Sequence, residues 1–126
     1  MTKKPNLILA AFLFFLGLVG FLPNPVVGNS GFSKTDTFHN FLHILLGLLL
    51  LTGVLWKSKS AGLFGKLGGA FLVFLSVAGF LFAKNEKLFG LLTANVLVNW
   101  LHLILGIAFF AASSEKEKIS PPAPTV

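Results

Sequence analysis

Four long apolar segments alternate with shorter polar ones along this chain. They cover residues 7–22, 38–56, 63–83 and 92–112. Each is long enough, or nearly so, to cross a hydrocarbon core of about 30 Å as a helix. The first follows two lysines, as a signal peptide would, but it lacks a small-residue cleavage site and runs into Pro23 and Pro25. The pattern therefore predicts an all-α polytopic membrane protein with four transmembrane helices.

The second half of the chain repeats the first at an offset of 59 residues. Residues 11–22 (AFLFFLGLVGFL) and 70–81 (AFLVFLSVAGFL) share eight of twelve positions, and residues 39–48 and 98–107 share five of ten. We predict one domain over residues 1–112, made by duplicating a two-helix unit, with repeats at about 7–56 and 63–112. Because each unit holds two spans, the halves have the same orientation, as a parallel repeat about a pseudo-two-fold axis along the membrane normal.

The polar segments between the spans differ in character. Residues 23–36 carry two prolines and two glycines, which predicts an ordered, turn-rich loop on the extracytoplasmic side. Residues 56–66 form a short connection on the cytoplasmic side. Residues 113–126 are charged and then proline-rich, which is typical of a solvated, disordered cytoplasmic tail.

The lysines indicate how the chain is oriented. The net charge is +6, but the chain has no arginine fork for phosphate, and we expect no binding to nucleic acid. Seven lysines fall on one side of a four-span arrangement and three on the other, namely Lys3, Lys4, Lys57, Lys59, Lys66, Lys116 and Lys118 against Lys34, Lys84 and Lys87. By the positive-inside rule both termini are cytoplasmic, in a bacterial inner membrane or a thylakoid membrane.

Each repeat carries the same polar motif, Asn-x-x-His-x-x-x-Gly, on its second helix. Polar side chains inside a span are costly, so they mark candidate sites with a nearby partner. The motif residues are Asn40, His43 and Gly47 in the first repeat, and Asn99, His102 and Gly106 in the second. Spacings of three and four residues put each set on one helical face, in the outer half of the bilayer. We therefore expect His43 and His102 to approach each other, with His39 nearer the extracytoplasmic end.

Three interpretations of this polar cluster remain open. In the first, each Asn and His hydrogen-bonds across the bundle to its counterpart, and the glycines allow close helix packing. In the second, His43 and His102 ligate a haem iron, or each binds a chlorophyll magnesium, although no cofactor is the simpler expectation. In the third, the histidines belong to a proton or solute pathway, as in a small channel or transporter.

Catalysis is not expected from these residues. The chain has no cysteine, and its four carboxylates, Asp36, Glu86, Glu115 and Glu117, fall in the predicted loops or tail. No acid–base pair therefore lies in the membrane, and no hydrolase, zinc-protease or phosphate-binding motif is present. No dedicated metal site is predicted.

Two blocks of the sequence resemble the DUF4383 family of small bacterial four-helix membrane proteins of unknown function. They are GFLPNPVVGNSGFSKTDTFHNFLHILLG (residues 20–47) and KLFGLLTANVLVNWLHLILG (residues 87–106). The repeated Asn-x-x-His with its glycine is the most specific part, and the resemblance covers about residues 7–112. It implies the four-helix fold and topology, and no activity.

These observations predict a non-catalytic integral membrane protein. We expect a small accessory or scaffold subunit that contacts membrane lipids and associates laterally with a larger membrane complex or with further copies of itself. The alternatives are a haem- or chlorophyll-binding electron-transfer or pigment subunit that uses His43 and His102, and a small channel or transporter.

Overall fold

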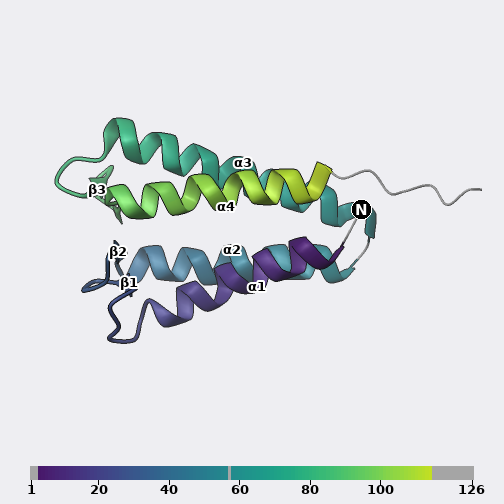
Figure 1. Ribbon diagram of the computed structural model, residues 1–126, viewed down its shortest axis with the longest axis horizontal. Coiled ribbons are helices and arrows are strands. Elements are labelled where there is room, and N and C mark those ends of the chain that lie inside the picture. The colour runs from purple at the N-terminus through teal and green to yellow at the C-terminus, as the bar shows by residue number, and fades with distance from the viewer. Residues whose placement is uncertain (1–2, 57, 115–126) are drawn as a thin grey trace, which may run out of the picture.

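The computed structural model describes residues 3–56 and 58–114, which form two helical hairpins packed side by side (Figure 1). The helices are α1 (Lys3–Val19), α2 (Thr37–Trp56), α3 (Ser58–Phe82) and α4 (Val96–Ser114). Helix α1 packs mainly on α2, and α3 packs mainly on α4. The start of α1 and the end of α4 lie at one end of the bundle (Figure 1). The prediction of an all-α protein with four helices is confirmed.

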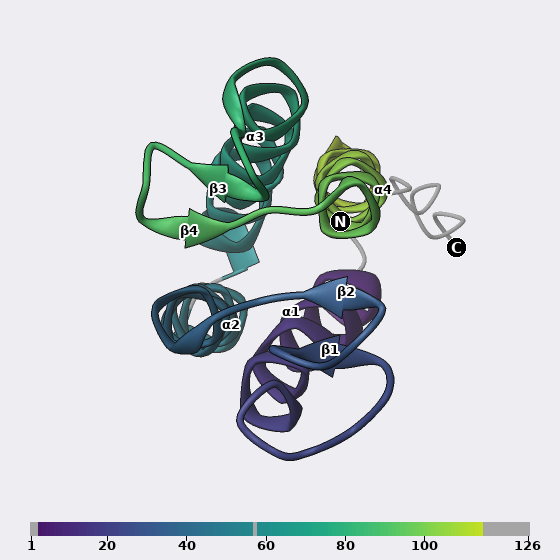
Figure 2. The ribbon, with the colours of Figure 1, turned by 90° about the vertical axis from the view of Figure 1, so that its left-hand side faces the viewer.

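Two short strand pairs close the other end of the bundle. Strand β1 (Val27–Gly28) pairs in parallel with β2 (Ser33–Lys34), and β3 (Lys87–Leu88) pairs antiparallel with β4 (Leu92–Thr93). The view along the helices shows that each loop reaches towards the other hairpin (Figure 2). Strand β2 contacts α4, and strand β4 contacts α2. The loops therefore join the hairpins as well as turning the chain.

Three helices are long and apolar enough to cross a membrane, within the part of the chain that the structure describes. They are Thr37–Trp56, Gly62–Phe82 and Val96–Ser114. Helix α1 is apolar but shorter, with 17 residues. It ends at Val19, three residues before the predicted boundary. The Val19 carbonyl oxygen accepts the Leu22 amide at 2.9 Å in a turn, and the Asn24 side-chain amide donates to the carbonyl oxygens of Val19 and Leu22 at 3.0 and 2.8 Å.

Two other predicted boundaries were wrong. Residues 58–62 belong to α3, although the predicted span began only at residue 63. Their fall in hydropathy does not end a helix, because the segment contains no proline and lysine is a good helix former. Residues 92–93 form a strand instead of the start of a helix, since α4 begins only after Asn95, whose Oδ1 accepts the Val98 amide at 3.0 Å.

The described end of α4 extends past the predicted domain boundary at residue 112. The buried Ser113 hydroxyl donates to Asn6 Oδ1 of α1 at 3.1 Å, so this residue is part of the bundle. Residues 115–126, where a disordered tail was predicted, lie outside the described residues.

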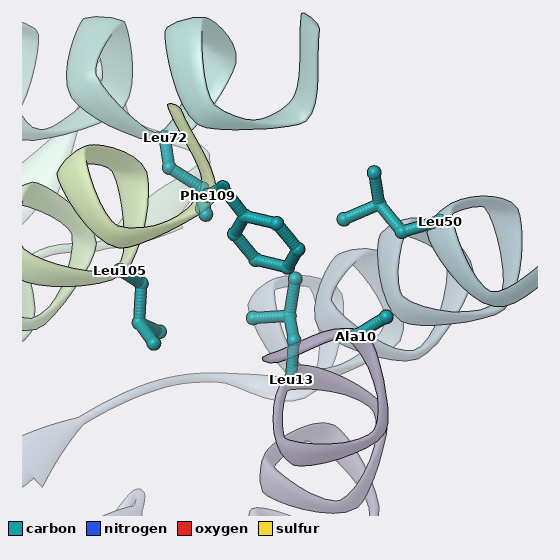
Figure 3. Packing of buried hydrophobic residues seen from close by; sticks show 6 residues of the cluster. All are labelled: Ala10, Leu13, Leu50, Leu72, Leu105 and Phe109. Atoms are coloured by element: carbon teal, nitrogen blue, oxygen red, sulfur yellow. The ribbon is translucent and has the colours of Figure 1, made fainter. Parts of the chain in front are cut away.

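The middle of the bundle is an apolar layer to which all four helices contribute (Figure 3). The Phe109 ring of α4 lies at its centre and is fully buried. The other members are Ala10, Leu13, Leu50, Leu72 and Leu105. Because the side chains come from both hairpins, this layer holds the two hairpins together.

Candidate functional site

A cluster of three imidazoles lies in the core between α2 and α4. His39 and His43 come from α2 at a spacing of four residues, and His102 comes from α4. The Nε2 atom of His102 lies 3.1 Å from Nε2 of His43 and 3.2 Å from Nε2 of His39. All three side chains are 2–3% exposed. The cluster contains every histidine of the chain.

The expected approach of His43 and His102 is confirmed, and His39, which was expected only nearer the extracytoplasmic end, joins them. An α-helix turns about 100° per residue, so residues four apart differ by only about 40° around the axis. The spacing of His39 and His43 was therefore the signal that could have placed both on the face towards α4. Position 98, which matches His39 in the second repeat, is a valine.

The two asparagines do not pair with each other across the bundle, so that part of the structural interpretation was wrong. Asn40 Oδ1 accepts a hydrogen bond from the Thr35 hydroxyl, and the Asn40 amide contacts Gly20 at the end of the first hairpin. The Asn99 amide contacts Gly79 in the same way in the second hairpin. Each asparagine thus packs within its own hairpin.

The motif glycines also allow the two helices of each hairpin to pack closely. A Cβ atom added at Gly47 would lie 2.6 Å from the Phe14 backbone nitrogen of α1, and one at Gly106 would lie 2.8 Å from the Gly69 carbonyl oxygen of α3. Around the helix axis, Asn40 and Gly47 are displaced about 60° and 40° from His43 in one direction, and His39 about 40° in the other. The residues of α2 therefore divide between α1, on which this helix packs, and α4, which the histidines reach across the bundle core.

A chain of hydrogen bonds connects the cluster to the loops. The His39 ring donates from Nδ1 to the Thr93 carbonyl oxygen at 2.7 Å, because a carbonyl oxygen can only accept. The Thr93 amide and hydroxyl donate to Asp36 Oδ2 at 2.9 and 2.7 Å, and Lys87 forms an ion pair with the same oxygen at 2.8 Å. Asp36 also caps α2, since its Oδ1 accepts the His39 backbone amide at 2.9 Å.

These contacts stabilise the ionised form of the Asp36 carboxyl group. Partial burial by itself would raise the pKa of this carboxyl group. The hydrogen bonds from Lys87, the His39 backbone and Thr93 act in the opposite direction and hold the pKa well below its ordinary value of 3.8. Asp36 is therefore an anion at neutral pH, and it fixes the peptide group that orients the His39 ring.

The geometry of the cluster argues against the macrocycle interpretation. A metal–imidazole bond is about 2.0–2.1 Å, so axial nitrogens on opposite sides of one metal lie about 4 Å apart with the ring between them. The His43 and His102 nitrogens are already at 3.1 Å. An apolar cavity of about 500 Å³ exists between α1 and α4, but no histidine lines it. What the cluster does offer is three convergent nitrogen ligands within 4.8 Å of one another.

The fold and the site define a small all-α protein with three membrane-length helices and a buried imidazole cluster between its two hairpins. The chain belongs to the DUF4383 family, whose model, described as a domain of unknown function, matches residues 5–114. The resemblance seen in the sequence is thereby confirmed. No curated protein and no solved structure matches the chain.

Proposed function

We propose that this protein is a non-catalytic, four-span membrane protein that acts by lateral association, as an accessory or scaffold subunit of a larger membrane complex. One observation carries the proposal. Most polar side chains in the middle of the helices are buried inside the bundle, as in the histidine cluster and the pair of Ser113 with Asn6, whereas Thr52 is exposed. The helix faces that point outward between the bundle ends are apolar, with exposed side chains such as Phe15, Phe74 and Ile104. Such faces suit lipid and apolar helices.

Matching helix caps and the contacts that they make with the other half support a duplicated unit. Asp36 and Asn95 are 59 residues apart, and each caps the following helix. Asp36 Oδ2 accepts the Thr93 amide of the second half at 2.9 Å, and Asn95 Oδ1 accepts the Lys34 amide of the first half at 3.3 Å. Lys34 and Thr93 are themselves 59 residues apart. This exchange between the halves is what a pseudo-two-fold axis along the bundle would produce.

The topology that we propose makes α1 a fourth span. Its 17 residues give a length of about 26 Å, and the exposed apolar Phe21 and Leu22 continue it towards the loop. With four spans both termini face the cytoplasm of a bacterial inner membrane, or the equivalent side of a thylakoid membrane. The lysine distribution supports the same orientation.

Single cysteines should report this topology directly, because the natural chain contains none. Ser30 in the first loop and Lys4 at the start of α1 are both exposed and described. In intact cells, Ser30→Cys should react with a membrane-impermeant maleimide, whereas Lys4→Cys should react only after permeabilisation. Equal labelling of both positions would rule out the proposed orientation, and the cysteine-free parent chain is the control.

One outward face carries an apolar recess. The apolar cavity of about 500 Å³ opens between α1 and α4, and both halves of the chain line it. Its walls include Phe12, Leu16, Phe32, Leu97, Trp100 and Ile104. Aromatic side chains around a hydrophobic recess are typical of protein interfaces. We propose that an apolar transmembrane helix of a partner protein packs here.

Substitutions of exposed aromatic residues should show whether this recess binds a partner or only contacts lipid. Trp100 and Phe74 are 51% and 60% exposed, but only Trp100 borders the cavity. We expect Trp100→Ala to reduce the yield of the native complex by at least about tenfold, as for a central aromatic contact, whereas Phe74→Ala should leave it unchanged. Blue native electrophoresis of solubilised membranes measures the yield.

A photo-crosslinker identifies the occupant of the cavity. Placed at Ile104, it should form an adduct with one polypeptide that also migrates in the native complex, and at Phe74 it should not. Adducts with lipid alone, or a chain that migrates alone in mild detergent, would contradict the accessory role. Adducts with a second copy would indicate a homo-oligomer instead.

The structure supports a conducting channel less well. The apolar layer around Phe109 separates the histidine cluster from the bundle end that holds Asn6 and Ser113. Its described members bring no polar side chain to the axis. A solute that reached the histidines would therefore meet an apolar barrier.

A further inference from the structure

We propose that His39, His43 and His102 form a binding site for one d-block metal cation, held by three neutral imidazoles. Their Nε2 atoms converge in the buried core, and every histidine of the chain takes part. This inference goes beyond lateral association and does not depend on it.

The distances between the nitrogens fit a metal site. In a tetrahedral site with metal–nitrogen bonds of about 2.0–2.1 Å, neighbouring ligand atoms lie about 3.3–3.4 Å apart. The two Nε2–Nε2 distances to His102 are 3.1 and 3.2 Å. These two distances are slightly shorter than an ion requires, and the three ligand atoms lie within 4.8 Å of one another, so small movements of the rings would admit the ion. Because the three ligands lie on two helices, the ion would also tie the hairpins together.

No placement of protons on the three neutral imidazoles gives every ring nitrogen a favourable contact. Because His39 carries its proton on Nδ1 to reach the Thr93 carbonyl oxygen, its Nε2 is a lone pair. If His102 Nε2 is protonated, it can donate to His39 or His43, but then its own Nδ1 is a buried acceptor without a partner. If His102 Nε2 is a lone pair, it faces the His39 lone pair at 3.2 Å. Every neutral assignment leaves an unfavourable contact or an unpaired nitrogen.

A cation at the centre removes the conflict among the three Nε2 atoms, because all of them can then present lone pairs to it. The Nδ1 atoms of His43 and His102 would carry the protons, and neither has a partner among the described residues. The outer nitrogen of His39 already makes the contact that metal-bound histidines usually make, an N–H donated to a backbone carbonyl oxygen. That carbonyl belongs to Thr93, whose amide and hydroxyl are held by Asp36. The Asp36 carboxylate thereby supplies negative charge close to the site, although its partner Lys87 balances part of it.

The ligand set defines the class of metal. Neutral imidazoles suit Zn²⁺, copper, Fe²⁺ and Ni²⁺, whereas Ca²⁺ and Mg²⁺ require oxygen ligands. No thiolate is available anywhere in the chain. Three protein ligands also leave a fourth tetrahedral position for water or an anion. Zn²⁺ is therefore the natural first probe, and Co²⁺ is its spectroscopic substitute.

The full chain, purified in mild detergent with an affinity tag free of histidine, tests the proposal. It should be incubated with Zn²⁺ or Co²⁺, passed through a desalting column, and analysed for metal by mass spectrometry. We expect about one ion per chain, since three imidazoles make a single site, and the intense visible bands of four-coordinate Co²⁺. Protein isolated from zinc-supplemented cells should carry the same content, which covers the case of a site closed to added metal.

The best variant is His39→Val, because the matching position 98 of the second half is naturally a buried valine. The fold should therefore accept it, as circular dichroism and gel filtration would verify, while the affinity for Zn²⁺ falls by at least about 100-fold. His102→Gln, as a separate variant, removes another of the three proposed ligands. Glu86→Gln, which removes an exposed carboxylate from the second loop, should leave binding unchanged. A metal-free chain in both preparations, or equal metal content in wild type and His39→Val, would overturn the proposal.

Discussion

Replacing Phe109 with alanine should lower the free energy of unfolding by about 3–5 kcal/mol, the range for removing a buried aromatic ring. The ring is fully buried and lies among side chains from all four helices (Figure 3). In a membrane the loss comes mainly from missing van der Waals contacts, because lipid tails are as apolar as the core. Titration with sodium dodecyl sulfate in mixed micelles measures the change.

The next residue along the helix is a matched control. Phe110 has the same side chain and is 49% exposed on the outside of α4. Phe110→Ala exchanges protein–lipid contacts for other protein–lipid contacts, so its effect should stay below about 1 kcal/mol, as for surface substitutions in general. Equal losses for the two variants would contradict the packing described for Phe109.

Replacing Asp36 with alanine should cost roughly 2–4 kcal/mol, because it removes a helix cap and leaves the part-buried Thr93 amide without its acceptor. Asp36→Asn should cost less, since Asn95 caps α4 with the same kind of side chain. The measurement is again the free energy of unfolding in mixed micelles, now as a function of pH.

The pH dependence has a definite sign. The folded-state pKa of Asp36 lies below its ordinary value of 3.8, so its contribution is complete above about pH 5 and is lost as the pH falls through 3.8 towards the folded-state value. The difference in stability between wild type and Asp36→Asn should therefore shrink on acidification. Glu86→Gln is the control, because its ion pair with Lys34 is nearly half exposed and should contribute at most about 1 kcal/mol. A gap that stays constant down to pH 3 would contradict the role given to Asp36.

The sequence predicted the histidine pair correctly because two kinds of periodicity agree there. Helical spacing placed His43 and Gly47 near one face, and the offset of 59 residues placed His102 at the same depth. The internal match therefore located the contact before any packing was known. It could not include His39, because the match pairs that residue with a valine.

The sequence pattern could not predict which helices the asparagines and glycines of the motif contact. A three- or four-residue spacing restricts side chains to a broad face, and a helix in a bundle touches more than one neighbour across such a face. Asn40 and Gly47 turn towards α1, while His39 turns towards α4. Only the tertiary structure, in which α2 packs on α1 and faces α4 across the bundle core, divides the motif in this way.

The sequence by itself determined the number of helices, their apolar character and the approach of His43 to His102, because length, hydropathy and periodicity are properties of the chain alone. The tertiary structure decided that His39 joins them and that Asp36 of one half anchors Thr93 of the other. These contacts join residues more than 50 positions apart, and their geometry depends on how two hairpins pack and where each loop crosses. The three-nitrogen cluster, and with it the proposed metal site, therefore exists only in the folded bundle.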